Sequence, residues 1–234
     1  MKVTVVVPTY QERGNIGRLI KGIGGALKGR DYEIVVVDDN SPDGTAEVAA
    51  GLAQTYPVKV IRREGKLGLG SAILAGFSNA QGDIVGVIDA DLQHPPELIA
   101  ELVTAVENGV DIAIASRYVS GGGVEHWSAS RKAVSKAATL LARPLTRTRD
   151  PMSGYFFVRR GVIDTQPFAA VGYKLLLEIL VKGSYETVRE LPYTFRERQE
   201  GHSKLGVREY VRYLKLLGHL YFGKAKGILG SKGS

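Results

Sequence analysis

The sequence predicts an α/β fold in which helices cover both faces of a mostly parallel β-sheet. Short runs of β-branched residues alternate with helical patterns through the first half of the chain, which is typical of strand–helix–strand units. The chain has 234 residues, of which 44% are apolar, enough for a sizeable core. It contains no cysteine, which excludes disulfide scaffolds and cysteine-based zinc sites.

The first half supplies most of the regular elements. Strands are expected at 3–7, 33–37, 58–61, 84–88 and 111–115, and helices near 15–27, 45–54, 70–80 and 96–107. Asp43 is a suitable cap for the second helix. The pair Pro95-Pro96 suits the first turn of the fourth helix.

The second half is less regular. Helices are expected at 128–141, 173–182 and 207–222, and strands at 155–159 and 185–191, with a polar loop through Ser203. The last helix is amphipathic and basic, with Val211, Leu214 and Leu217 on one stripe. Such a stripe either lies on a membrane surface or packs against the domain, and the sequence leaves both open. We expect one domain over residues 1–228, with interface helices at about 128–142 and 207–222, and a flexible tail over 229–234.

Charge is unevenly distributed along the chain, whose net charge is +7. Residues 1–116 hold 10 basic and 15 acidic side chains, whereas residues 117–234 hold 21 and 9. The basic half suggests an anionic partner. No apolar run is long enough to cross a membrane, and the first residues lack the pattern of a secretory signal, so export is not expected. Whether a membrane anchor or a partner subunit completes the protein stays open.

The residues that follow each strand are candidates for a site, because ligands of open α/β sheets lie beyond the carboxyl ends of the strands. Asp89 and Asp91 follow the fourth strand, and positions i and i+2 of extended backbone point the same way. With the Gln93 carbonyl oxygen nearby, three hard oxygens suit Mg²⁺ or Mn²⁺. An isolated Asp-x-Asp pattern is more often a solvated turn.

Two further segments in the acidic half suit a nucleotide, one after the second strand and one before the third predicted helix. Asp38 and Asp39 follow the second strand, where a carboxylate can meet a ribose hydroxyl or a base edge. Lys66 precedes a glycine-containing entry to a helix, where free N–H groups can meet a phosphate, although a tight turn explains the same pattern.

The basic half offers candidate phosphate ligands. Arg117 follows a strand and Arg131 lies on the helix at 128–141, and a guanidinium group binds phosphate through two parallel hydrogen bonds. Lys132 and Lys136, on the same helix, are expected to belong to a solvated charged face.

Six motifs occur in the order seen in family 2 glycosyltransferases of the GT-A type. They are PTYQE at 8–12, VDDNSPDGT at 37–45, DADLQHPPE at 89–97, SRY at 116–118, DPMSG at 150–154 and PYTFR at 192–196. Several motifs in register are more specific than any one alone. From about residue 3 to residue 222, the chain therefore resembles this family, and within it the dolichol-phosphate mannose synthases.

The resemblance implies a Rossmann-like GT-A fold and metal-dependent transfer of mannose from GDP-mannose to a dolichyl or polyprenyl phosphate, with inversion. The implied donor-binding residues are Pro8, Tyr10, Glu12, Val37, Asp39, Lys66, Asp89, Ala90, Asp91, His202 and Lys204. The implied metal ligands for Mg²⁺ or Mn²⁺ are Asp89, Asp91 and Gln93, and the implied catalytic residues are Asp89, Asp91, Arg117, Arg131 and Ser135. Gln11 stands where the family more often has Asn, and position 202 also departs from the common pattern.

This chemistry needs no strong base. A phosphate monoester, with a second pKa near 6, is largely dianionic at pH 7, so a site rich in arginine suits it better than one built on histidine. The resemblance places the enzyme peripherally at the cytoplasmic face of a membrane. The same fold acting on UDP-glucose or another nucleotide sugar stays open. A basic nucleic-acid-binding protein is disfavoured, because the acidic cluster would repel a polyanion, so no nucleic acid partner is expected.

Overall fold

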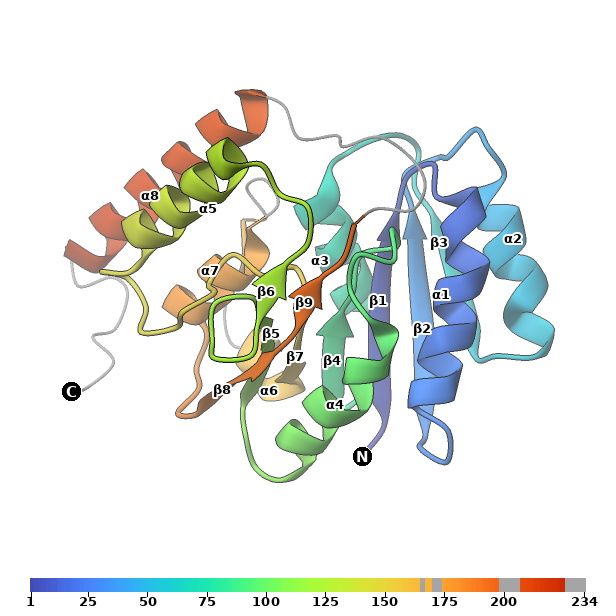
Figure 1. Cartoon of the computed structure of the whole chain (residues 1–234). Coiled ribbons are helices and arrows are strands. Elements are labelled where there is room, and N and C mark those ends of the chain that lie inside the picture. The colour runs from blue at the N-terminus through green and yellow to red at the C-terminus, as the bar shows by residue number, and fades with distance from the viewer. Residues whose placement is uncertain (165–166, 170–173, 198–206, 226–234) are drawn as a thin grey trace.

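The computed structural model describes residues 1–164, 167–169, 174–197 and 207–225. Within them a seven-stranded sheet has the strand order β3-β2-β1-β4-β7-β5-β8 (Figure 1). Its strands are β1 (Val3–Thr9), β2 (Tyr32–Asp38), β3 (Val58–Arg62), β4 (Ile84–Val87), β5 (Ile112–Ser116), β7 (Phe156–Arg159) and β8 (Val188–Pro192). A separate ladder pairs β6 (Gly123–Val124) with β9 (Thr194–Phe195).

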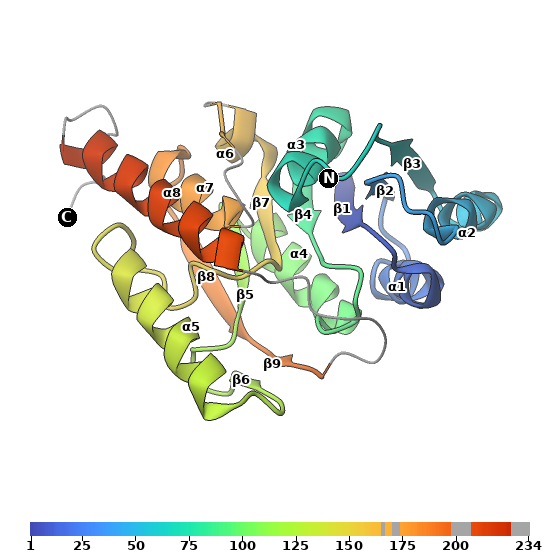
Figure 2. The same ribbon diagram turned by 90° about the horizontal axis from the view of Figure 1, so that it is seen from above.

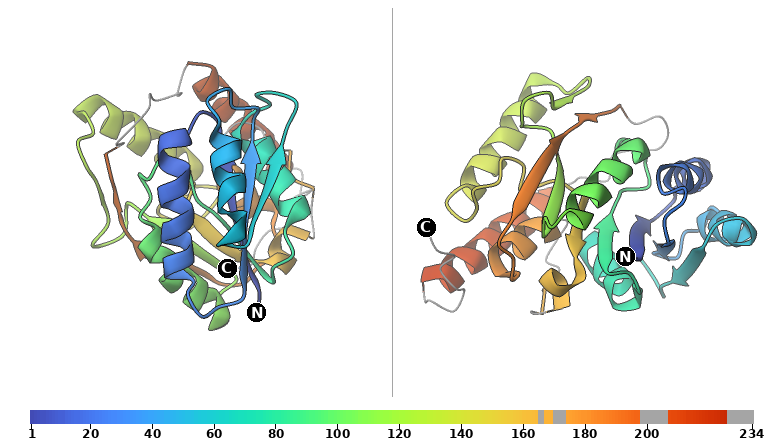
Figure 3. Two further views of the ribbon diagram at one scale, coloured as in Figure 1. Left: turned by 90° about the vertical axis from the view of Figure 1, so that its right-hand side faces the viewer. Right: turned by 90° about the horizontal axis from the view of Figure 1, so that it is seen from below.

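Helices cover both faces of the sheet, as predicted, and Figure 3 shows α1 and α3 on opposite sides of it. The helices are α1 (Arg13–Ala26), α2 (Thr45–Gly51), α3 (Leu69–Asn79), α4 (Ile99–Glu107), α5 (Ala129–Ala142), α6 (Arg160–Asp164), α7 (Leu175–Lys182) and α8 (Val207–Ala225), with 3₁₀ turns at Leu52–Gln54 and Pro96–Leu98. Val3, Val5 and Val7 of β1 join one core with α1 and α4, while Val6 joins the core beneath α3 and α7. This alternation follows from the two-residue period of a strand.

The sheet is mostly parallel, and β7 is the exception. The pairs β1–β2, β1–β4, β2–β3 and β5–β8 are parallel, whereas β7 runs antiparallel between β4 and β5. An antiparallel strand begins at the edge where its parallel neighbours end. The loop 150–154 therefore lies at the carboxyl edge of the sheet, beside the residues that follow β4 and β5.

Several predicted boundaries differ from the structure. The strand expected at 185–191 begins at Val188, and α6, β6 and β9 had no counterpart in the prediction.

Gly44, with φ of 84°, stands at the N-cap of α2 instead of Asp43. Asp43 accepts hydrogen bonds from the backbone N–H groups of Arg13 and Thr45, at 3.2 and 3.1 Å, and so joins the starts of α1 and α2. The tail at 229–234 and the loop through Ser203 lie outside the described residues.

Helices α5 and α8 lie beside the sheet rather than on it (Figure 2). Two tyrosine hydroxyls of α8 donate to carbonyl oxygens of α5: Tyr213 to Ala138 and Tyr221 to Leu141, both at 2.6 Å. The stripe predicted on the last helix is divided, because Leu217 is buried in a small core while Val211 and Leu214 are 47% and 58% exposed. One apolar side of α8 thus packs against the domain and another faces outward.

Close packing of α3 on β1 requires glycine at position 76. A Cβ placed there would lie 2.3 Å from Cγ1 of Val6, whereas one at Gly17 in α1 would lie 3.8 Å from Cγ1 of Val48. We expect Gly76→Ala to lower the free energy of unfolding by roughly 1–3 kcal/mol through overpacking. Gly17→Ala should raise it by roughly 0.5–1 kcal/mol, since it removes chain entropy only from the unfolded state. Urea unfolding measures both, and equal effects would contradict this account of α3.

Candidate active site

The loop after β1 meets the loop after β2. Pro8 and Val37 are paired in register on β1 and β2, and both are buried. Val37 belongs to the hydrophobic core, so its backbone is the part that remains for a ligand. Asp38 is also buried, and its carboxylate accepts from Thr9 Oγ1 at 2.8 Å and from the Ser41 N–H at 2.8 Å. Asp38 therefore stabilises the loop. Its carboxylate is buried, so it is not exposed to a ligand as the sequence predicted.

Asp39 organises the segment that carries Lys66. Its carboxylate accepts from Nε of Arg63 at 2.6 Å and from the N–H of Gly68 at 3.2 Å. The Lys66 amine lies 4.3 Å from the centre of the Tyr10 ring, within the range of a cation–π contact. Two predicted donor-binding residues, 56 positions apart in the sequence, thus meet at the edge of the sheet.

Glu12 and Gln11 fix the start of α1. Glu12 is buried and accepts from Nδ2 of Asn15 at 2.9 Å, while its N–H donates to Thr45 Oγ1. Gln11 has φ of 54°, in the left-handed region that Asn adopts more readily than most other residues. This backbone geometry gives a physical reason for the Asn that is more usual there.

The carboxylates after β4 fit a divalent cation in part. The Asp91 side chain is buried and accepts from the N–H of Gln93 at 3.1 Å, whereas Asp89 is 30% exposed at its side chain. A Cβ at Gly154 would lie 3.1 Å from Oδ2 of Asp89, so glycine keeps space beside this carboxylate. Among the described residues no group of three His, Cys, Asp or Glu side chains is placed to hold a metal ion. Two carboxylates then require further oxygens from water and substrate, as is common for Mg²⁺.

Gln93 connects the carboxylates to β9. Its Nε2 donates to the carbonyl oxygen of Arg196 at 3.0 Å, and the Arg196 N–H donates back to the Gln93 carbonyl at 2.9 Å. The amide nitrogen is thus engaged by the backbone, and Oε1 is the atom of this side chain that suits a cation.

His94 is buried below the carboxylates. Its ring stacks on Tyr155 at 5.2 Å and meets Tyr193 and Phe195 edge-on. Burial lowers the pKa of His94 to about 4, so the imidazole is neutral at pH 7. Nδ1 has no hydrogen-bond partner among the described residues, and Nε2 lies 3.9 Å from Oδ2 of Asp89. This histidine supports the aromatic floor of the site.

Arg117 and Asp150 form a buried ion pair. Nε and one terminal nitrogen of Arg117 donate to the two carboxylate oxygens at 2.8 and 2.7 Å, and the Arg117 N–H donates to the same carboxylate at 2.9 Å. The two side chains are 9% and 0% exposed. Although burial alone would lower it, the pKa of Arg117 is raised by its hydrogen bonds and proximity to Asp150. The guanidinium group is thus permanently charged and fixed in orientation.

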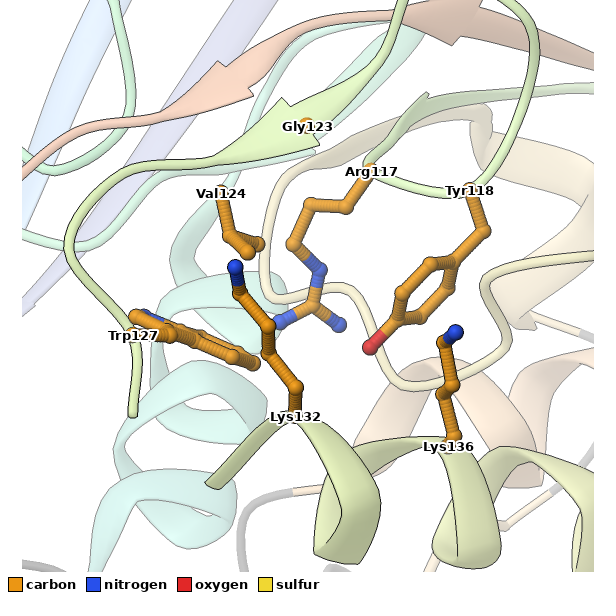
Figure 4. Close-up of a pocket in the computed structure, with 7 residues that line it drawn as sticks. All are labelled: Arg117, Tyr118, Gly123, Val124, Trp127, Lys132 and Lys136. Atoms are coloured by element: carbon orange, nitrogen blue, oxygen red, sulfur yellow. The ribbon is translucent and has the colours of Figure 1, made fainter. Parts of the chain in front are cut away.

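A cavity of about 170 Å³ opens beside this pair (Figure 4). It is lined by Arg117, Tyr118, Gly123, Val124, Trp127, Lys132 and Lys136. The Tyr118 hydroxyl lies 2.7 Å from Oγ of Ser135, and the Arg131 guanidinium carbon lies 4.3 Å from the Trp127 ring centre. Arg117, Arg131 and Ser135, to which the family resemblance assigns one function, therefore gather around one cavity, although of the three only Arg117 lines it.

The structure also brings to this site residues for which the sequence predicted no role in it. Asp150 belongs to the DPMSG motif, but the sequence predicts no role for this residue. The feature that could have pointed to it is its negative charge within the basic half of the chain. Trp127 joins Arg117 and Arg131 through its ring. Lys132 and Lys136 are exposed, as expected for a solvated face, yet they line the cavity. His202, Ser203 and Lys204 lie outside the described residues.

Comparison with known proteins decides the family. The sequence pattern of glycosyl transferase family 2 matches residues 4–166. The chain belongs to this family. It is 50% identical to the dolichol-phosphate mannosyltransferase of Pyrococcus furiosus over 94% of its own length, and it spans 63% of that relative. It is 36% identical to the Saccharomyces cerevisiae protein of the same name, covering 96% of this chain and 88% of that one. The resemblance inferred from the motifs is confirmed.

Solved structures agree on the fold. Glucosyl-3-phosphoglycerate synthase from Mycobacterium tuberculosis, solved in complex with Mn²⁺ and UDP, superposes with a TM-score of 0.71 at 22% identity, covering 99% of this chain and 82% of that one. Mannosyl-3-phosphoglycerate synthase from Rubrobacter xylanophilus gives 0.69 at 24% identity, covering 99% and 77%. The predicted GT-A type of α/β fold is confirmed by these likenesses.

Removing Asp150 should destabilise this glycosyltransferase strongly, because Arg117 would be left buried without its counter-charge. We expect Asp150→Ala to lower the free energy of unfolding by about 3–5 kcal/mol. Glu97→Ala, which breaks the exposed Glu97–Arg196 pair at 3.8 Å, should cost at most about 1 kcal/mol. Urea unfolding followed by circular dichroism measures both. A similar small loss for both variants would show that the buried pair carries no special weight.

Proposed function

We propose that this family 2 glycosyltransferase transfers mannose from GDP-mannose to the phosphate of a dolichyl or polyprenyl lipid, producing a lipid-phosphate mannose for glycosylation. The observation that carries the proposal is its 50% identity to the Pyrococcus furiosus dolichol-phosphate mannosyltransferase over 94% of this chain. The arrangement of a carboxylate pair near a cation-lined cavity supports it, since the donor carries a diphosphate and the acceptor a phosphate.

The donor would lie across the ends of β1, β2 and β4. Tyr10 and Lys66, which contact each other, would bind the nucleotide, and Asp89 and Asp91 would face its diphosphate. The remaining proposed donor contacts are Pro8, Glu12, Val37, Asp39, Ala90, His202 and Lys204. Of these, Val37 and Ala90 are core residues, so backbone atoms would make their contacts.

Asp89, Asp91 and the side-chain oxygen Oε1 of Gln93 would hold Mg²⁺ or Mn²⁺. When bound, such a cation offsets the negative charge that develops on the leaving diphosphate. Asp91, held by the Gln93 N–H, presents a carboxylate of fixed orientation, and Gly154 leaves Asp89 the space to turn toward the ligand.

The acceptor phosphate would enter the cavity beside Arg117, with Arg131 and Ser135 at its border. Because the phosphate monoester is already largely dianionic at pH 7, the chain must align its oxygen with the sugar carbon rather than remove a proton. This agrees with His94, which is buried, stacks on Tyr155 and does not line the cavity.

Helices α5 and α8 would rest on a membrane surface and place the enzyme peripherally, at its cytoplasmic face. Their outward apolar side chains include Val134, Leu140, Leu141, Val211, Leu214 and Phe222, which are 46–67% exposed. On α8, the exposed cations Arg212 and Lys215 suit anionic headgroups. Within the described part of the chain no helix is long and apolar enough to cross a membrane.

The decisive assay supplies GDP-mannose or UDP-glucose, with Mn²⁺ and a short water-dispersible polyprenyl phosphate, and measures the sugar on the lipid product. We expect transfer from GDP-mannose and loss of transfer with EDTA. Transfer from UDP-glucose alone would overturn the mannose proposal.

A variant separates metal use from folding in that assay. Asp91→Asn keeps the size of a side chain that is 7% exposed but removes its charge, so we expect turnover to fall at least about 100-fold, in line with losing one electrostatic stabiliser. Unchanged circular dichroism is the control for folding.

Membrane binding is tested by vesicle co-sedimentation. We expect Leu140→Glu with Phe222→Glu to weaken binding to vesicles by roughly tenfold or more, because each buried apolar side chain contributes about 1.5–3 kcal/mol. Both residues are more than 60% exposed, so folding should be unaffected. Leu67→Glu, at a residue of equal exposure on a distant loop, is the matched control and should bind as the parent does. Equal loss in both proteins would contradict the proposed face.

A further inference from the structure

The charge of Arg117 is already balanced within the protein. Its guanidinium group makes two hydrogen bonds to Asp150, at 2.7 and 2.8 Å, in a nearly solvent-free environment. The pair is therefore neutral as a unit, although the N–H groups that Asp150 does not engage still donate. A phosphate dianion entering the cavity requires about two positive charges for balance, and this pair contributes none.

Lys132 and Lys136 are the cations that line the same cavity without such compensation. They are four residues apart on α5, so they lie one above the other on one face of the helix. Figure 4 shows both side chains extending from α5 toward the residues that line the cavity, with Lys132 beside Arg117 and Val124 and Lys136 beside Tyr118. Among the described residues no carboxylate forms an ion pair with either amine.

Arg131, by contrast, stands outside the lining of the cavity. Its guanidinium carbon lies 4.3 Å from the ring centre of Trp127, and the ring forms part of the wall. Arg131 thus supports the wall through a cation–π contact. The cationic residue type that the motifs emphasise is arginine, whereas the uncompensated charge at the cavity belongs to lysine.

We propose that Lys132 and Lys136 together supply the positive charge that binds the acceptor's phosphate monoester, while Arg117 and Asp150 form a neutral, hydrogen-bonding floor. Two ammonium groups match one phosphate dianion, and ammonium groups on flexible stems adapt to a headgroup carried by a long lipid chain. This inference rests on the proposed function for the identity of the acceptor, and it names the residues that select an acceptor bearing two charges.

Binding can be measured without turnover, because Trp127 is the only tryptophan of the chain and lines the cavity. We would titrate farnesyl phosphate into the full chain without donor or vesicles and follow Trp127 fluorescence. The proteins are the parent, Lys132→Gln, Lys136→Gln and the double variant. Lys28→Gln, at an exposed position after α1, carries the same change in net charge away from the cavity and is the control.

We expect each single lysine variant to raise the dissociation constant about tenfold and the double variant about 100-fold, as for charge-assisted hydrogen bonds, with Lys28→Gln unchanged. The salt dependence of binding should also flatten in the double variant. In steady state, KM for farnesyl phosphate should rise while KM for the donor stays constant. An unchanged dissociation constant in the double variant would overturn the proposal, as would an equal rise in Lys28→Gln.

Two further measurements distinguish a lipid surface from the acceptor phosphate, and the lysine assignment from the proposed function. Loss of binding to anionic vesicles, with farnesyl phosphate binding unaffected, would assign the lysines to the lipid surface and overturn the inference. Lysine-dependent binding of farnesyl phosphate in a protein that transfers no mannose would support the lysine assignment while refuting the proposed function. Mannose transfer by the double variant with the parent's KM would leave the function standing and remove the lysines from it.

Discussion

The buried pair of Arg117 and Asp150 is the interaction on which the site depends. Arg117 follows β5, the neighbour of the edge strand β8, whereas Asp150 belongs to the loop that precedes the antiparallel strand β7. The N–H of Asp150 in turn donates to Glu190 of β8 at 2.9 Å. One ion pair thus joins three segments at the carboxyl edge, and because both charges are buried, neither can move without leaving the other uncompensated. This ion pair therefore fixes the position of Arg117 in the lining of the cavity.

The two halves of the site share a wall. Gln93 links Asp91 to the backbone of Arg196 just after β9, and β9 pairs with β6, which contributes Gly123 and Val124 to the cavity. The aromatic floor around His94 fills the space beneath this connection. A donor bound near the carboxylates and an acceptor in the cavity would therefore contact parts of the same short ladder. The Gln93 side chain and the β6–β9 pairing together connect these two regions.

Local patterns carried the prediction of the fold, and long-range pairing limited it. The β-branched runs and the apolar helical stripes are properties of neighbouring residues, so β1 to β5 and α1 to α4 lie close to their predicted positions. The antiparallel direction of β7 is set by partners far away in the chain, and β6 and β9 are two-residue strands without a readable period. For the same reason Asp150 was quoted in a motif but not paired with Arg117, 33 residues earlier. The sequence predicts a solvated face for Lys132 and Lys136, because it shows which helix face they share but not the cavity that this face lines.

The hydroxyls of Tyr213 and Tyr221 join helices α5 and α8. They bond to carbonyl oxygens at Ala138 and Leu141, within two turns of Lys136. Helix α5 therefore has two contacts of different kinds, with the cavity on one side and with α8 on another. The two hydrogen bonds connect α8 to the helix that carries Lys132 and Lys136. Through α5, the outward face of α8 and the lining of the cavity therefore belong to one packed unit.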